Sequence, residues 1–174
     1  MYTFTYDASL GANITFLDGG RTVHLVIPPG ALPNGTVVTI YRGNPAVLGP
    51  LLPAGQTYID SYAVSWRTPA GTSPDAALPL VLSVADPAVT PGSTVYVTNR
   101  TGVQPTTATV AAGSWSVSFS TDPGYVAAVA NPSLPRAGLR LPTIMGFLPA
   151  ILLILGLLAG PALARFGYRR ARGR

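Results

Sequence analysis

The feature that most constrains this chain is a run of 24 residues without a charged side chain, from Leu141 to Ala164. As a helix rising about 1.5 Å per residue, the run would be about 36 Å long, enough to cross a hydrocarbon core of about 30 Å with some tilt. A helix buried in a soluble core is usually shorter and carries a polar stripe. The sequence therefore predicts one transmembrane helix, residues 142–164.

Arginine is distributed unevenly around this run. Five arginines follow it within ten residues, whereas only Arg136 and Arg140 lie in the ten residues before it. Basic residues next to a span are retained on the cytoplasmic side. We therefore expect a cytoplasmic tail, residues 165–174, and an extracytoplasmic domain, residues 1–131, at the inner or plasma membrane. The arginines that carry this topology signal are Arg165, Arg169, Arg170, Arg172 and Arg174.

An extracytoplasmic domain needs an export signal. The opening residues 1–7 hold neither the basic region nor the apolar core of a signal peptide. Two alternatives stay open: a signal sequence upstream of these residues, which we expect, or a domain that faces the cytoplasm against the charge rule.

The net charge of +5 comes from the region around the run. Residues 1–135 hold four arginines and six aspartates, a formal charge of −2. The domain therefore has no basic face to follow a phosphate backbone, so nucleic acid is excluded as a partner. Arginine without any lysine, together with abundant alanine, glycine and proline, is typical of a GC-rich bacterial genome.

The chemistry open to this chain is narrow, because it contains no cysteine and no glutamate. Disulfides, thiolate metal sites and thiol nucleophiles are excluded. The single histidine, His24, alternates with Val23 and Leu25, so its side chain should point away from the core. The aspartates are scattered and form no calcium-binding loop. We expect no catalytic residue, no metal, no cofactor and no small-molecule substrate.

Short segments of alternating apolar and polar residues fill the domain. Trp115, Val117 and Phe119 alternate with serines, which is typical of a half-buried antiparallel strand. Trp66 and Trp115 both fall on the apolar parity, so both are expected in the core. No window before residue 140 has helical periodicity. Strands are predicted near residues 3–6, 12–16, 22–27, 36–42, 61–67, 80–84, 94–98, 114–120 and 124–130.

Eight or nine short strands predict an all-β fold: an antiparallel Ig-like β-sandwich followed by one C-terminal transmembrane α-helix. The proline-rich segment 132–141 is expected to be a stiff juxtamembrane linker. Within the span, Gly156 and Gly160 have the small-xxx-small spacing that lets membrane helices approach closely. We predict that these two glycines form a helix-packing face.

Three polar side chains of the domain stand out. Asp60 shares its strand parity with Tyr62 and the residues after it, so we expect a hydrogen-bonded carboxylate at a strand end. Tyr41 and Tyr96 fall on the polar parity. Exposed tyrosines suit a surface that binds a protein partner or a carbohydrate, but two positions are too few to make a binding platform.

Residues 23–40 carry the most specific pattern of the domain, a strand that ends in a tight turn before the next strand begins. Its residues are Ile27, Pro28, Gly30, Ala31 and Leu32, followed by Val38 and Ile40 at the inward positions of the next strand. This pattern resembles the signature of the β-sandwich domain shared by ankyrins, netrin receptors and zonula occludens scaffolds. The resemblance implies a sandwich that acts as an interaction module and not as an enzyme. The chain lacks the ankyrin repeats and death domains of that family, so the family's partners are not carried over.

These observations favour a non-catalytic accessory or scaffolding subunit of a multi-subunit membrane complex, with respiratory and photosynthetic complexes as the first class to consider. Its expected partners are other integral membrane subunits and the lipid bilayer. The alternative is a membrane-anchored module for cell-surface adhesion or sensing. A subunit should have its interface along Gly156 and Gly160, whereas an adhesin should have a patch far from the membrane.

Overall fold

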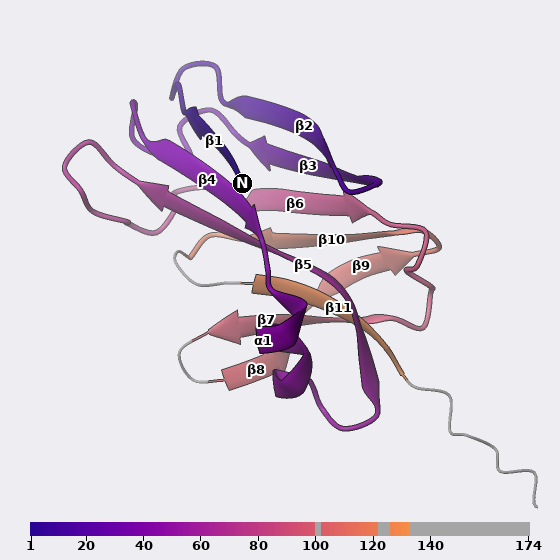
Figure 1. Cartoon of the computed structure of the whole chain (residues 1–174). Helices are drawn as coiled ribbons and strands as arrows, with labels where there is room; N and C mark the ends of the chain where they lie inside the picture. Colours follow the sequence, from indigo (N-terminus) through magenta and orange to yellow (C-terminus); the bar gives the residue numbers. More distant parts are fainter. Residues whose placement is uncertain (100–101, 122–125, 133–174) are drawn as a thin grey trace, which may run out of the picture. The chain divides into compact units, whose positions relative to one another are not determined.

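The computed structural model describes residues 1–99, 102–121 and 126–132. These residues form two antiparallel sheets packed as a sandwich, which makes one compact unit (Figure 1). The antiparallel β-sandwich predicted from the sequence is confirmed for this part of the chain. The predicted linker after Pro132, the span and the tail lie outside the described residues. Among the residues that are described, no helix is long and apolar enough to cross a membrane.

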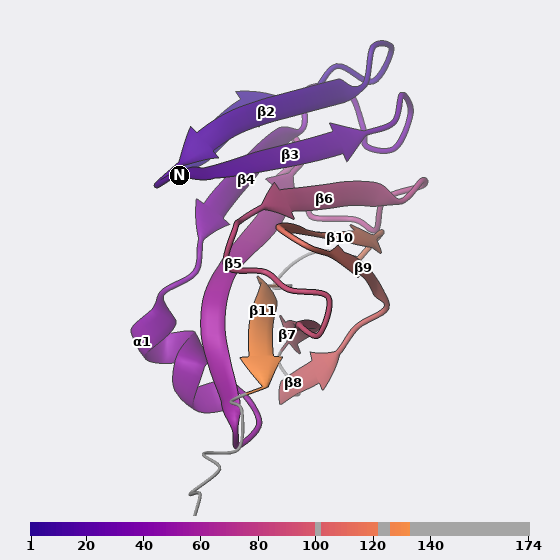
Figure 2. The same ribbon diagram turned by 90° about the vertical axis from the view of Figure 1, so that its right-hand side faces the viewer.

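One sheet has six strands and the other has five, and every neighbouring pair of strands is antiparallel. Across the first sheet the order is β1 (Tyr2–Thr5), β4 (Val37–Arg42), β5 (Gln56–Arg67), β11 (Val126–Pro132), β7 (Thr94–Asn99) and β8 (Gly102–Pro105). Across the second it is β2 (Ala12–Asp18), β3 (Arg21–Ile27), β6 (Leu80–Ala85), β10 (Ser114–Phe119) and β9 (Ala108–Ala111). Figure 2 shows β5 and β11 on one side of the sandwich and β6 and β10 on the other.

The core lies between the sheets and is built from the alternate residues of each strand. Trp66 and Trp115 are both buried there, as predicted. In β3, Val23, Leu25 and Ile27 are buried while the residues between them are partly exposed. Period-two alternation therefore decides which side chains fill the space between the sheets.

The segment that carries the family resemblance connects β3 to β4. Gly30 has a φ of 74°, a left-handed conformation that favours glycine. Ala31 and Leu32, which follow it, are buried. Val38 and Ile40 of β4 are also buried, which confirms their predicted inward positions.

The structure adds elements that the sequence pattern did not predict. Eleven strands are present in the described residues, because β8 and β9 add to the predicted set. Each has only four residues and lies at the edge of its sheet, so its alternation is too short to detect. A helix α1 (Pro45–Leu48) and a 3₁₀-helix η1 (Gly49–Leu51) also contradict the expectation of no helix before residue 140.

The helix had a local signal. Asn44 caps its N-terminus by accepting a hydrogen bond from the Ala46 N–H, and Pro45 occupies the first helical turn. Asparagine followed by proline is a typical helix start. Four residues are too few for helical periodicity to be visible.

The outer face of the six-stranded sheet carries a second, smaller apolar cluster. It contains Leu52, Tyr96, Ala128 and Ala130. The prediction that Tyr96 is exposed is wrong, because Tyr96 is buried in this cluster. Tyr41, by contrast, is exposed as expected. Alternation assigns a side chain to one face of a sheet, but it does not tell whether another segment covers that face.

Candidate functional site

A cluster of charged side chains lies between the two sheets. Arg21 begins β3 of the five-stranded sheet and Asp86 directly follows β6 of the same sheet, whereas Asp60 comes from β5 of the opposite sheet. Arg21 Nε donates a hydrogen bond to Asp86 Oδ2 and lies 3.6 Å from Asp60 Oδ2. One guanidinium group therefore connects a carboxylate from each sheet.

A β-bulge in β5 lies directly before Asp60, which faces the interior on the same parity as Tyr62. Asp60 pairs with Val129 of β11, but the next residue of β11, Ala130, pairs with Tyr58. Ile59 is therefore the extra residue of the bulge. Because of it, Tyr58 packs against the outer apolar cluster while Asp60 faces the core.

Asp60 is 0% exposed, and its two oxygens have different surroundings. Trp115 Nε1 donates a hydrogen bond to Oδ1 at 3.1 Å. No hydrogen-bond donor within the described residues reaches Oδ2. Asp86 is also buried, and its Oδ1 accepts the Ala88 N–H at 2.8 Å, which holds the carboxylate in place. A buried, ionised carboxylate is costly when one of its oxygens has no hydrogen-bond donor. The ionised form of Asp60 therefore lowers the stability of the folded protein.

The surroundings of Asp60 change its protonation. Burial, with a further contribution from the nearby charge of Asp86, raises the pKa of Asp60 to about 7. The Trp115 hydrogen bond and the Arg21 charge act in the opposite direction but are smaller. Near neutral pH, Asp60 therefore exchanges between its protonated and ionised forms. In the protonated form it no longer repels Asp86, and the single positive charge of Arg21 balances one carboxylate.

A second polar group lies beside the first, at the turn between β2 and β3. The Tyr62 hydroxyl donates a hydrogen bond to Asp18 Oδ2 at 2.8 Å, and Arg42 Nε lies 3.9 Å from the same oxygen. Burial and this hydrogen bond raise the pKa of Tyr62 above its ordinary value. Asp18 pairs with Arg21 across the hairpin, so one tight turn positions a member of each group.

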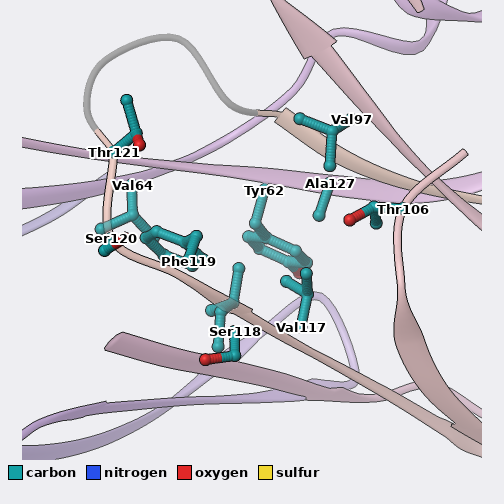
Figure 3. A pocket seen from close by; sticks show the side chains of 11 residues that line it. Tyr62, Val64, Val97, Thr106, Val117, Ser118, Phe119, Ser120, Thr121 and Ala127 are labelled. Carbon is teal, nitrogen blue, oxygen red and sulfur yellow. The ribbon is translucent and has the colours of Figure 1, made fainter. Parts of the chain in front are cut away.

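A cleft of about 290 Å³ opens between the sheets next to these groups (Figure 3). Figure 3 shows the ring of Tyr62 in the middle of the view, with Phe119 to its left and Val117 to its right. Among the described residues, the lining is apolar apart from the Tyr62 hydroxyl and the hydroxyl groups of Thr106, Ser118, Ser120 and Thr121. These lining residues include no charged side chain and no pair of an acid and a base.

The geometry of the charged cluster limits its chemistry. General acid or base catalysis needs a titratable group within hydrogen-bond reach of a substrate. Asp60 is completely buried, so a substrate has no access to it. Within the described residues, no three histidine, aspartate or glutamate side chains are grouped as a metal site requires. The arrangement fits a structural connection between the two sheets.

The other residues that the sequence singled out have separate positions. His24 is partly exposed on the outer side of β3, as predicted, and its Nε2 lies 2.6 Å from Asn13 Oδ1 on the neighbouring strand β2. Asp60 is hydrogen-bonded, as predicted, but the predicted strand-end position is wrong, because Asp60 lies within the twelve-residue strand β5 and faces the interior. Gly156 and Gly160 are outside the described residues. So are the five topology arginines, Arg165, Arg169, Arg170, Arg172 and Arg174.

Sequence reasoning missed that Arg21 and Asp86 surround Asp60. A signal for Arg21 was present, because Arg21 lies on the same parity as Val23 and Leu25, which face the core. Asp60 has the same relation to Tyr62. When two different strands carry side chains of opposite charge at positions that face the core, an ion pair between them is expected.

Comparison with known proteins adds no family to this description. No protein-family model matches the chain, and no curated protein matches its sequence.

Proposed function

We propose that this protein is a non-catalytic single-span membrane subunit that uses an extracytoplasmic Ig-like sandwich for protein contacts. The observation that carries the proposal is the uncharged run Leu141–Ala164, followed directly by five arginines. In this account residues 142–164 cross the inner or plasma membrane and residues 132–141 link the span to the sandwich. Residues 165–174 lie in the cytoplasm.

The sandwich is consistent with such a role. Its charged cluster joins the partly exposed Arg21 to the buried Asp60 and Asp86 and connects the two sheets, so it contributes to the rigidity of the domain. Sandwich domains serve many functions, so the fold alone does not select one. The pattern from Ile27 to Leu32 supports an interaction module, through its resemblance to the domain shared by ankyrins, netrin receptors and zonula occludens scaffolds.

The partners of a subunit are other integral membrane proteins, and the span offers a surface for them. Gly156 and Gly160 lie four residues apart, so in a helix they share one side. Small residues at this spacing let the backbone of a second helix approach and gain van der Waals contact. This face is the expected site of lateral assembly.

Replacing both glycines with leucine should fill that face while the span stays as apolar as before. We expect Gly156→Leu/Gly160→Leu to insert into the membrane normally but to co-purify with its partner subunits about tenfold less in mild detergent. Ala162→Leu is the matched control, because at 3.6 residues per turn it lies on nearly the opposite side of the helix. The readout is the yield of co-purified subunits relative to the tagged chain.

The outcomes separate the two functions considered. Loss of partners in the double variant alone supports the subunit. Retention of the partners at the parent level contradicts the glycine face as an interface and favours a membrane-anchored adhesion or sensing module. Equal loss in the double variant and the control would indicate damage to the span itself.

A further inference from the structure

The helical segment after β4 exposes an unusual amount of apolar surface. No charged residue occurs between Arg42 and Asp60, and this stretch contains both α1 and η1. Val47 is 60% exposed and Leu51 is 54% exposed. The alanines and prolines among residues 45–54 are exposed as well. We call these exposed side chains the α1–η1 surface.

The segment is held firmly against the sandwich by its other side. Leu48 and Leu52 are buried, and Leu52 belongs to the cluster on the outer face of the six-stranded sheet. Gly43 permits this close approach, because a Cβ atom there would collide with Leu48 and Ser61. Val47 and Leu51 are therefore exposed together on a segment whose other side is packed against the sandwich. Apolar residues scattered singly over a surface are not grouped in this way.

The α1–η1 surface lies at the end of the sandwich from which the chain continues. Gln56, the first residue of β5, pairs with Pro132, the last residue of β11. Figure 2 shows α1 and the arrowhead of β11 toward the same end of the six-stranded sheet. Between Pro132 and Leu141 the chain can extend at most about 30 Å. If residues 142–164 span a bilayer, the sandwich is confined near its surface.

We infer that the α1–η1 surface contacts the lipid bilayer and inserts Val47 and Leu51 into the headgroup region. The inference rests on the proposed function, because it requires the span. An uncharged, proline-rich apolar surface has no side chain that is costly to move into the interface, and burial of its apolar area favours the contact. The charged residue that precedes this stretch in the sequence is Arg42, whose side chain is 39% exposed and is attracted by anionic lipids. The contact holds the sandwich in a defined orientation.

Single-cysteine labelling of the full chain tests this inference. The chain has no cysteine, so Val47→Cys or Leu51→Cys carries one environment-sensitive fluorophore at a known position. Leu10→Cys is the control, because Leu10 is 78% exposed. Leu10 follows β1, whose last residue pairs with the first residue of β4. The helix α1 follows the last residue of β4, so the chain leads to Leu10 and to α1 from opposite ends of this strand. The labelled chains are reconstituted into vesicles of phosphatidylcholine and phosphatidylglycerol that contain a headgroup-region spin-labelled lipid.

The expected result is that fluorophores at positions 47 and 51 lose roughly half of their emission to the spin label, because an interfacial segment lies within about 5–10 Å of the headgroup and acyl boundary. The fluorophore at position 10 should keep its emission. Vesicle flotation is measured on the same samples. If the chain does not float with the vesicles, the proposed function fails.

If the chain floats but the fluorophores at positions 47 and 51 keep their emission as the one at position 10 does, the inference is overturned while the proposed function stands. If cysteines at positions 47 and 51 are protected from a water-soluble thiol reagent in native membranes but not in lipid vesicles, the inference is overturned in favour of a protein partner on this surface.

Discussion

Replacing Arg21 with methionine should lower the free energy of unfolding by about 3–5 kcal/mol at about pH 8, one of the two largest effects we expect for a single substitution. Methionine keeps much of the side-chain volume but leaves Asp60 and Asp86 without their shared cation. Asp60 must then take up a proton or remain an uncompensated buried charge beside Asp86, and either outcome costs stability. At about pH 5 the loss should be smaller, because protonation of Asp60 removes one of the charges.

Urea unfolding of the full chain in detergent measures this effect. The two tryptophans of the protein, Trp66 and Trp115, are both in the core of the sandwich, so their fluorescence reports on this domain alone. Arg67→Met is the matched control, since Arg67 is exposed at the end of β5 and its replacement should change stability by no more than about 0.5 kcal/mol. Equal losses in the two variants would contradict a special role for Arg21.

The second large effect concerns pH. The unfolded chain releases the Asp60 proton near pH 3.9, whereas the folded protein holds it until about pH 7. Between these values the folded state binds more protons than the unfolded state, so stability should fall as the pH rises and level off above about 7. We expect this fall to be about 1–4 kcal/mol. Asp60→Asn should remove it and make the variant more stable than the parent above about pH 7.

Asparagine suits this test because it keeps the size of the side chain and an oxygen that can accept from Trp115. The measurement is urea unfolding at several pH values, again followed by tryptophan fluorescence. Asp75→Asn is the control, because Asp75 is exposed and its replacement should leave the pH profile unchanged. If parent and Asp60→Asn show parallel profiles, Asp60 is not the group that retains the proton.

The strands and the inward side chains could be predicted because they depend on local alternation. Trp115 and Val117 are buried and the serines that alternate with them are more exposed, as the pattern of β10 indicates. The same reasoning placed His24 on the outer side of β3. Such predictions need only the two-residue period of a strand with one buried face.

The charged cluster could not be predicted in the same way, because its members come from distant parts of the sequence. Asp60 and Arg21 each appear as a polar residue on an apolar parity, but nothing local indicates that they meet. Their contact depends on how the two sheets pack, which no local pattern indicates. The error at Tyr96 has a similar cause, since the segment that covers it lies in another part of the chain.

The measurement that tests the central claim most directly is the side of the membrane on which each end of the chain lies. Leu10→Cys and Gly173→Cys provide one reactive thiol each in a chain that has none. In intact cells, a membrane-impermeant maleimide should label Leu10→Cys, and it should label Gly173→Cys only after the membrane is permeabilised. Labelling of Gly173→Cys in intact cells, or protection of Leu10→Cys until permeabilisation, would contradict a single span with an extracytoplasmic sandwich.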